Sequence, residues 1–110
     1  MAKFTIRKSF SNQYYFRLQA TGNNETLITS EMYNTKSACI DGIASVKANA
    51  PYDSRYDRLH SSNRQYYFNL KSSNGQVIGT SETYISLTNR DAGIELVKAQ
   101  APSASTEDLS

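Results

Sequence analysis

The chain of 110 residues has the length of one domain, and its hydrophobic content of 38%, with 8 Tyr and 4 Phe, excludes a disordered chain. The net charge of +2 is too close to zero to indicate nucleic acid or an acidic membrane surface as a partner. Cys39 is the only cysteine, which excludes an intrachain disulfide and a metal cluster built on thiolates.

The first 30 residues predict three short strands. Apolar and polar residues alternate over 4–8 and again over 14–20, and this alternation is typical of strands with one buried face. The Gly and Asn residues within 21–24 tolerate the positive φ that tight turns need. They are therefore predicted to close a hairpin onto a third strand over 26–30.

The hydrophobic period then changes from that of a strand to that of a helix. Between 35 and 49, Cys39, Ile43 and Val46 are spaced four and three residues apart. This spacing places them in one stripe along a helix. Pro51 is expected to stop the helix, because it lacks the backbone N–H that a helix interior requires.

The second half of the chain repeats this order of elements. The predicted segments are a weaker strand over 55–59, a strong strand over 66–71, a hairpin turn at 73–75, a strand over 76–81 and a helix over 88–100 that Pro102 ends. The start of that helix, 88–91, resembles a capping box. The tail over 103–110 is small, polar and acidic, so we expect it to be disordered.

The two halves also repeat in their residues. Tyr14-Tyr15-Phe16-Arg17-Leu18 returns as Tyr66-Tyr67-Phe68-Asn69-Leu70 at an offset of 52, and Ser11-Asn12 returns as Ser62-Asn63 at an offset of 51. From Thr29 to Pro51 the offset is constant at 51. These matches predict two copies of one folding unit, with length changes in loops at two places.

A copy of about 50 residues buries too little surface to be stable alone, so the copies are expected to share one core. The prediction is a single pseudo-twofold domain over 1–102, with repeat one at 3–51 and repeat two at 54–102. Its fold class is α+β: two β-β-β-α repeats form one mostly antiparallel sheet with two helices packed on one face. The other face is left to solvent or a partner. Tyr33 and Tyr84, at the sheet-to-helix corners, are predicted to be packing residues.

The doubled motifs identify a family resemblance. The Tyr-Tyr-Phe strand, the Ser-Glu-x-Tyr segment and the Gly-Ile-x-x-Val-Lys-Ala helix, each present twice within 4–102, resemble the small bacterial proteins grouped as UPF0339, also known as the DUF1508 or YegP-like domain. The resemblance implies tandem repeats, or dimers of single repeats, in one continuous sheet, with strands that can be exchanged between units. It implies no list of catalytic residues, because the family has no assigned function.

Both units lie in one chain, so the dimer interface of single-repeat relatives would be supplied internally and we expect a monomer. The copies differ at Met32 and Thr83, and at Ile28 and Gly79, so they are not functionally interchangeable by inspection. No apolar segment resembles a signal peptide or a membrane span, so a cytoplasmic location is expected.

The sequence offers little to build an active site from. His60 is the only histidine and is predicted to lie on the surface, where Ser9 stands at the offset of 51, and Cys39 is predicted to act as a small hydrophobe rather than a reactive thiol. No phosphate loop, dinucleotide fingerprint or zinc spacing occurs. We therefore predict no catalytic residue, no cofactor and no metal site.

Two glutamates recur where each third strand leads into a helix. Glu31 and Glu82 could accept hydrogen bonds from helix N–H groups, or pair with Lys47 and Lys98. The alternative is a site in which the two carboxylates face one another across the pseudo-twofold. An enzyme acting through Glu31 and Glu82 is thus the third of our functional hypotheses.

The open sheet face carries the best functional candidates. If the Phe and Leu residues of the strong strands point to the helices, the candidate binding face on the other side is Tyr15, Arg17, Tyr67, Asn69 and Lys71. Aromatic rings beside basic groups on a sheet can hold single-stranded nucleic acid, although the sheet lacks the RNP sequences of an RRM. The other interpretations are a protein or peptide partner, or tyrosines that only stabilise the sheet.

The first functional hypothesis is a non-enzymatic binding or interaction module of unknown partner, because a patterned aromatic face stands beside no catalytic motif. The alternative is a nucleic-acid-associated protein that binds single strands on the exposed aromatic and basic face.

Overall fold

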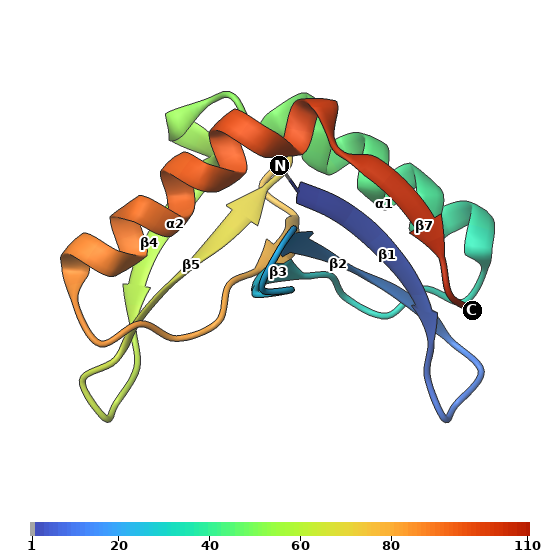
Figure 1. Cartoon of the computed structure of the whole chain (residues 1–110), viewed down its shortest axis with the longest axis horizontal. Coiled ribbons are helices and arrows are strands. Elements are labelled where there is room, and N and C mark those ends of the chain that lie inside the picture. The colour runs from blue at the N-terminus through green and yellow to red at the C-terminus, as the bar shows by residue number, and fades with distance from the viewer. Residues whose placement is uncertain (1) are drawn as a thin grey trace.

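The computed structural model describes residues 2–110, which form one seven-stranded sheet with two helices on one side of it (Figure 1). The strands are β1 (Ala2–Lys8), β2 (Tyr14–Ala20), β3 (Thr26–Thr29), β4 (Tyr56–His60), β5 (Tyr66–Lys71), β6 (Val77–Thr80) and β7 (Ser105–Asp108). The helices are α1 (Lys36–Asn49) and α2 (Leu87–Gln100), followed by single 3₁₀ turns at Asp53–Arg55 and Ala101–Ser103. The α+β class and the doubled β-β-β-α order are confirmed. No helix of residues 2–110 is long and apolar enough to cross a bilayer.

The strand order is β4-β5-β6-β3-β2-β1-β7, with antiparallel neighbours everywhere except at the parallel pair β1–β7. The two three-stranded units meet where β3 runs beside β6, paired at Thr29 and Thr80. Figure 1 shows the sheet as an arch, with both helices above it and the β1–β2 and β4–β5 loops pointing away from them at opposite ends. One face of the sheet is therefore left open between these two loops.

The core lies between the sheet and the helices and is continuous across both repeats. Phe16 and Leu18 of β2, and Phe68 and Leu70 of β5, are completely buried, as the alternation of these strands predicts. Ile43, Val46, Ile94 and Val97 complete the core from the helices. Burying both apolar stripes against one sheet explains how two short units stabilise each other.

Equivalent glycines set how closely each helix approaches the sheet. A Cβ atom at Gly42 would lie 2.5 Å from the Tyr33 hydroxyl, and one at Gly93 would lie 2.5 Å from the Tyr84 hydroxyl. Both tyrosines are partly buried against the core. Their predicted role in packing is therefore confirmed.

The helix starts differ partly from prediction. Ser86 is the N-cap of α2, because its side chain accepts a hydrogen bond from Asn89 N at 3.0 Å. The predicted capping box at 88–91 is wrong, since those residues already lie inside the first turn. Thr35 caps α1 in the same way, accepting from Ala38 N at 3.1 Å.

The predicted disordered tail, 103–110, is corrected by the structure, because residues 105–108 form β7. This strand pairs with β1 from Lys3–Ser105 to Ile6–Asp108. Ion pairs join Lys3 to Glu107 at 3.0 Å and Lys36 to Asp108 at 2.8 Å. The outer edge of β1 offers unpaired backbone groups, and β7 satisfies them without burying any of its own side chains.

The length difference between the repeats occurs in one place rather than two. The β1–β2 and β4–β5 loops are equally long: Ser9 N donates to Gln13 O, and Ser61 N donates to Gln65 O, each at 2.7 Å. The predicted offset of 51 at Ser11-Asn12 is therefore wrong, and residues of this loop correspond at an offset of 52.

Repeat two is instead one residue shorter in its second hairpin, at the β5–β6 turn. Ala20 N bonds to Glu25 O across the β2–β3 turn, whereas Ser72 N bonds to Gln76 O across the β5–β6 turn. With the loops aligned this way, the counterpart of His60 is Lys8 and not Ser9, because His60 pairs with Tyr66 as Lys8 pairs with Tyr14.

Candidate functional site

The five predicted face residues alternate with fully buried core residues along β2 and β5. Tyr15, Arg17, Tyr67, Asn69 and Lys71 are each half-buried, which places them on the open side of the sheet. Strands β6 and β3 lie between β5 and β2, so the axes of the outer pair are about 14 Å apart across the sheet. The two tyrosines therefore form two separate sites and not one continuous stacking platform.

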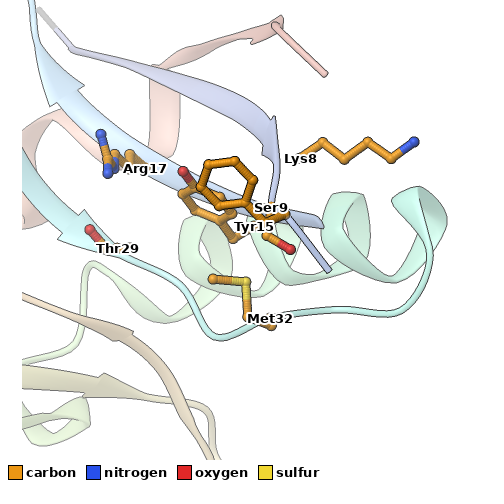
Figure 2. A pocket seen from close by; sticks show the side chains of 7 residues that line it. Lys8, Ser9, Tyr15, Arg17, Thr29 and Met32 are labelled. Carbon is orange, nitrogen blue, oxygen red and sulfur yellow. The ribbon is translucent and has the colours of Figure 1, made fainter. Parts of the chain in front are cut away.

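In repeat one the open face is hollowed and cationic. The Arg17 guanidinium carbon lies 5.6 Å from the centroid of the Tyr15 ring. A hollow of about 440 Å³ beside them is also lined by Phe10, Thr29 and Met32. Figure 2 shows Met32 approaching from the segment that follows β3, on the far side of the hollow from the β2 side chains. The arrangement combines one cation with an aromatic and apolar wall.

In repeat two the polar side chains on the same side of the sheet bind one another. Lys71 forms an ion pair with Asp57 of the neighbouring β4 at 3.0 Å. Asn69 Oδ1 accepts a hydrogen bond from the Thr80 hydroxyl at 2.8 Å. Tyr67 thus stands beside an amide and a paired lysine, whereas Arg17 forms no ion pair within residues 2–110.

Sequence reasoning missed several residues of the first hollow. Phe10 and Met32 are both exposed, and Ser9 completes the β1–β2 side. Met32 was noticed only as a difference from Thr83. The missing signal was the loop register, because aligning the loops at 52 would have set Phe10 against Ser62.

A buried polar network supports the sheet next to the hollow. Arg7 donates to the Thr5 hydroxyl and to Gln19 Oε1, each at 3.2 Å. The Thr5 hydroxyl also donates to Gln19 Oε1 at 3.1 Å, and Thr5 is almost completely buried. These hydrogen bonds hold the Arg7 side chain along the sheet, and the Arg7 backbone pairs with that of Tyr15. Sequence reasoning had not singled out this arginine.

The recurring glutamates make none of the predicted contacts with helix or lysine. Glu31 and Glu82 are exposed, and within residues 2–110 neither takes part in an ion pair. The preceding serine carries the repeated contact instead: Ser30 Oγ accepts from Phe16 N and donates to the Glu31 carbonyl. Ser81 repeats this arrangement in the second copy. The Ser-Glu motif therefore reflects a structural serine.

The candidate nucleophile and the candidate acid–base residue lie apart from the open face. Cys39 is completely buried on α1, where burial, followed by the charge of Asp108, raises the pKa of its thiol to about 11. A thiol with this pKa stays protonated near neutral pH. His60 is exposed at the end of β4, as predicted. Across residues 2–110 no group of three His, Cys, Asp or Glu side chains is placed to hold a metal ion.

Comparison with known proteins agrees with the geometry of two repeats. The family model DUF1508, described as a domain of unknown function, matches residues 10–57 and 61–108. Each matched unit starts in the loop before the Tyr-Tyr-Phe strand and runs past the helix into the next strand.

Similar proteins cover almost the whole chain. The UPF0339 protein YegP of Escherichia coli K12 is 45% identical over 105 residues, spanning 96% of this chain and 94% of its own length. A UPF0339 protein of Bordetella pertussis is 47% identical over 108 residues, spanning 98% and 96%. The solution structure of a UPF0339 protein from Shewanella oneidensis has a TM-score of 0.91 at 41% identity, covering 98% of this chain and 91% of that one. These relatives carry no enzymatic name.

Proposed function

The chain belongs to the DUF1508 family of UPF0339 proteins, and we propose that it is a non-enzymatic binding module that uses the open face of its sheet. One observation carries this proposal: the Arg17 guanidinium lies over the Tyr15 ring, at the edge of a hollow, and within residues 2–110 it makes no ion pair. An accessible cation beside an aromatic ring is suited to holding an anionic or aromatic partner.

The positions of the reactive groups support a binding role over catalysis. Acid–base or nucleophilic catalysis needs at least two groups that converge on one reacting atom. Cys39 is buried on the helix side, whereas His60 lies at the end of β4, and neither lines the hollow. Glu31 and Glu82 also line none of the three hollows found over residues 2–110.

A second candidate is the binding of single-stranded nucleic acid. The proximity of Arg17 and Tyr15 favours it, because a cation beside an aromatic ring can hold phosphates and bases of a single strand. The Lys71–Asp57 ion pair opposes it, because this pair neutralises the lysine that the second half of the face would offer to a strand. A short contact at repeat one is therefore more consistent with the geometry than a strand that crosses both repeats.

The proposal can be tested by amide chemical-shift titration of isotope-labelled protein. Single-stranded RNA, single-stranded DNA and a mixture of short peptides would be added separately, at low and at moderate salt. We expect shifts that cluster on the open face, above all on Tyr15 and Arg17. Shifts confined to the helices, or an absence of shifts with all ligand classes, contradict the proposal.

The nucleic-acid candidate makes a narrower prediction in the same titration. Its affinity should fall as salt rises, since binding releases counterions from phosphates. It should also be lost when Tyr15 and Tyr67 are both replaced by Ala. Affinity that is insensitive to salt rules this candidate out and leaves a protein or peptide partner.

We further propose that the module is a cytoplasmic monomer. The sheet already joins two repeats through β3 and β6, which supports a unit that needs no second chain. Light scattering tests the monomeric state directly, and a mass near twice 12.3 kDa contradicts it.

A further inference from the structure

Among residues 2–110, repeat one carries a well-formed hollow on the open face, although both repeats have the same order of elements. Each residue of the lining has a structural counterpart in repeat two, found through the strand pairing and the equal loops. Four of the pairs change chemistry: Lys8 becomes His60, Phe10 becomes Ser62, Arg17 becomes Asn69 and Met32 becomes Thr83. Tyr15 and Thr29 are kept as Tyr67 and Thr80. Repeat two therefore serves as an internal comparison, in which four of the lining residues are replaced and the fold is kept.

The cation of this hollow is Arg17. Lys8 also lines it, but its ammonium lies over the ring of Tyr14 at 5.6 Å, and Figure 2 shows its chain extending away from Tyr15. Arg7 is engaged with its neighbours on the sheet. The guanidinium of Arg17 has five N–H donors in a planar fork, and in the described residues it contacts no carboxylate. Its donors therefore remain for an anionic group on a ligand.

The apolar side of the hollow is unusually exposed. Phe10 is fully exposed at the β1–β2 loop, and Met32 is 50% exposed on the segment after β3. Phe10 packs against no core residue, and its counterpart in repeat two is a serine. Aromatic and methionine side chains of this kind adapt well to a flat ring, because both are polarisable and Met is flexible.

The volume limits what the hollow can hold. At about 440 Å³ it falls in the range of small-molecule sites. Resting on the proposed binding function, we propose that this hollow in repeat one binds a small aromatic anion, with its ring against Phe10, Tyr15 and Met32 and its charged group on Arg17. The ligand chemistry is one planar ring and one acidic group. A nucleoside monophosphate and an aromatic carboxylate are two sources of that chemistry.

Titration with two acids and their neutral analogues tests the proposal. The probes are adenosine 5′-monophosphate with adenosine, and 3-phenylpropionate with 3-phenylpropanamide, monitored through the backbone amides. We expect at least one acid to shift the amides of the hollow, and its neutral analogue to bind roughly tenfold more weakly, because hydrogen bonds to charged groups are the strong ones. If only adenosine 5′-monophosphate binds, or only 3-phenylpropionate binds, the result supports the proposal and identifies which source supplies the ligand.

Substitutions taken from repeat two supply the matched variants. Arg17→Asn and Phe10→Ser each install the residue that the second repeat already uses, at positions outside the core. Each should weaken binding by roughly tenfold, whereas Arg64→Asn should change it less than about twofold. Arg64→Asn removes the same charge from the β4–β5 loop and installs the residue found at its counterpart, Asn12.

The failure of this inference differs from the failure of the proposed function. If neither acid shifts the hollow at about 10 mM, a range in which even weak binders respond, the aromatic-anion assignment is wrong. It is also wrong if Arg64→Asn weakens binding as much as Arg17→Asn, because the attraction is then only net charge. After either result, the proposed binding function still holds if oligonucleotides or peptides shift the amides of the open face. If no ligand class shifts them, the proposed function is wrong as well.

Discussion

The two repeats have the same fold and differ on the side of the sheet that faces away from the helices. Phe16 and Phe68 are equally buried. Gly42 and Gly93 each lie so close to a tyrosine that an added Cβ atom would be 2.5 Å from its hydroxyl. On the open face, by contrast, repeat one presents Arg17 over the Tyr15 ring beside a hollow, while in repeat two Lys71 pairs with Asp57 and Asn69 bonds to Thr80. These core residues are alike in the two repeats, although other buried positions such as Ile28 and Gly79 differ, and several of the exposed differences line the hollow.

The edges of the sheet differ in the same way. The outer edge of β1 is covered by β7, whereas β4, the counterpart of β1, is an outermost strand of the sheet. The strand that follows α1 is β4, which pairs with β5. The strand that follows α2 is β7. Because one edge of β1 is already paired with β2, β7 pairs with the other, outer edge of β1. The added strand β7 thus makes the edges of an otherwise symmetric pair of repeats different.

The largest expected effect tests the symmetry of the core. Phe16→Ala and Phe68→Ala should each lower the free energy of unfolding by about 3–5 kcal/mol, because both rings are completely buried. Urea denaturation of the two variants measures this. A difference between them of more than about half that loss would show that one repeat dominates the shared core.

The glycine contacts provide the next test. Gly42→Ala and Gly93→Ala should each cost about 1–3 kcal/mol, since the new Cβ would meet a tyrosine hydroxyl 2.5 Å away. The control is a double variant, Gly42→Ala with Tyr33→Phe, which removes the nearest of the clashing atoms. It should recover part of the lost stability in urea denaturation. No recovery would mean that the cost arises elsewhere in the helix.

Removal of residues 105–110 tests the asymmetry of the edges. The truncated chain should stay folded, because none of the β7 side chains is buried. Amide protons in β1 should exchange roughly tenfold faster, since edge strands open with little free energy once unpaired. Exchange in β4 should not change. Equal acceleration in β1 and β4 would instead indicate global destabilisation.

The smallest expected effect concerns a charge cluster found in repeat two. Asp53 contacts Arg58 at 2.8 Å and Lys98 at 2.6 Å, and these hydrogen bonds lower the pKa of its carboxyl from 3.8 to about 2. Lys47, the counterpart of Lys98, lies over the Phe4 ring as Lys98 lies over the Tyr56 ring, but within residues 2–110 it forms no ion pair.

Because the pKa of Asp53 is depressed in the folded state, its contribution is complete above about pH 4 and is lost as the pH falls toward 2. Asp53→Asn should therefore lower the Tm slightly at neutral pH, and most of that effect should be gone near pH 2. Thermal unfolding from pH 7 to pH 2 measures this. Asp41→Asn, the same change on the exposed side of α1, is the control and should leave the Tm unchanged. If both variants lose the same Tm, the Asp53 contacts add nothing specific.

Much of the candidate site was within reach of the sequence, but its selectivity was not. The alternation in β2 and β5 placed Tyr15 and Tyr67 on the open face correctly, because side-chain direction in a strand is local. Whether a basic residue there is free depends on its neighbours across the sheet. Lys71 is paired by Asp57, fourteen positions earlier on another strand, and no local pattern indicates that contact.

The sequence alone determined the elements, their duplication and the fold class, since period two in the strands and the apolar stripes of the helices are properties of neighbouring residues. Tertiary structure decided where the polar tail goes. Lys3 meets Glu107 across 104 positions, and β7 forms only because β1 is already in place with an open edge. It also decided which repeat keeps a hollow, because the loop register and the approach of Met32 become visible only when strands distant in the sequence are paired.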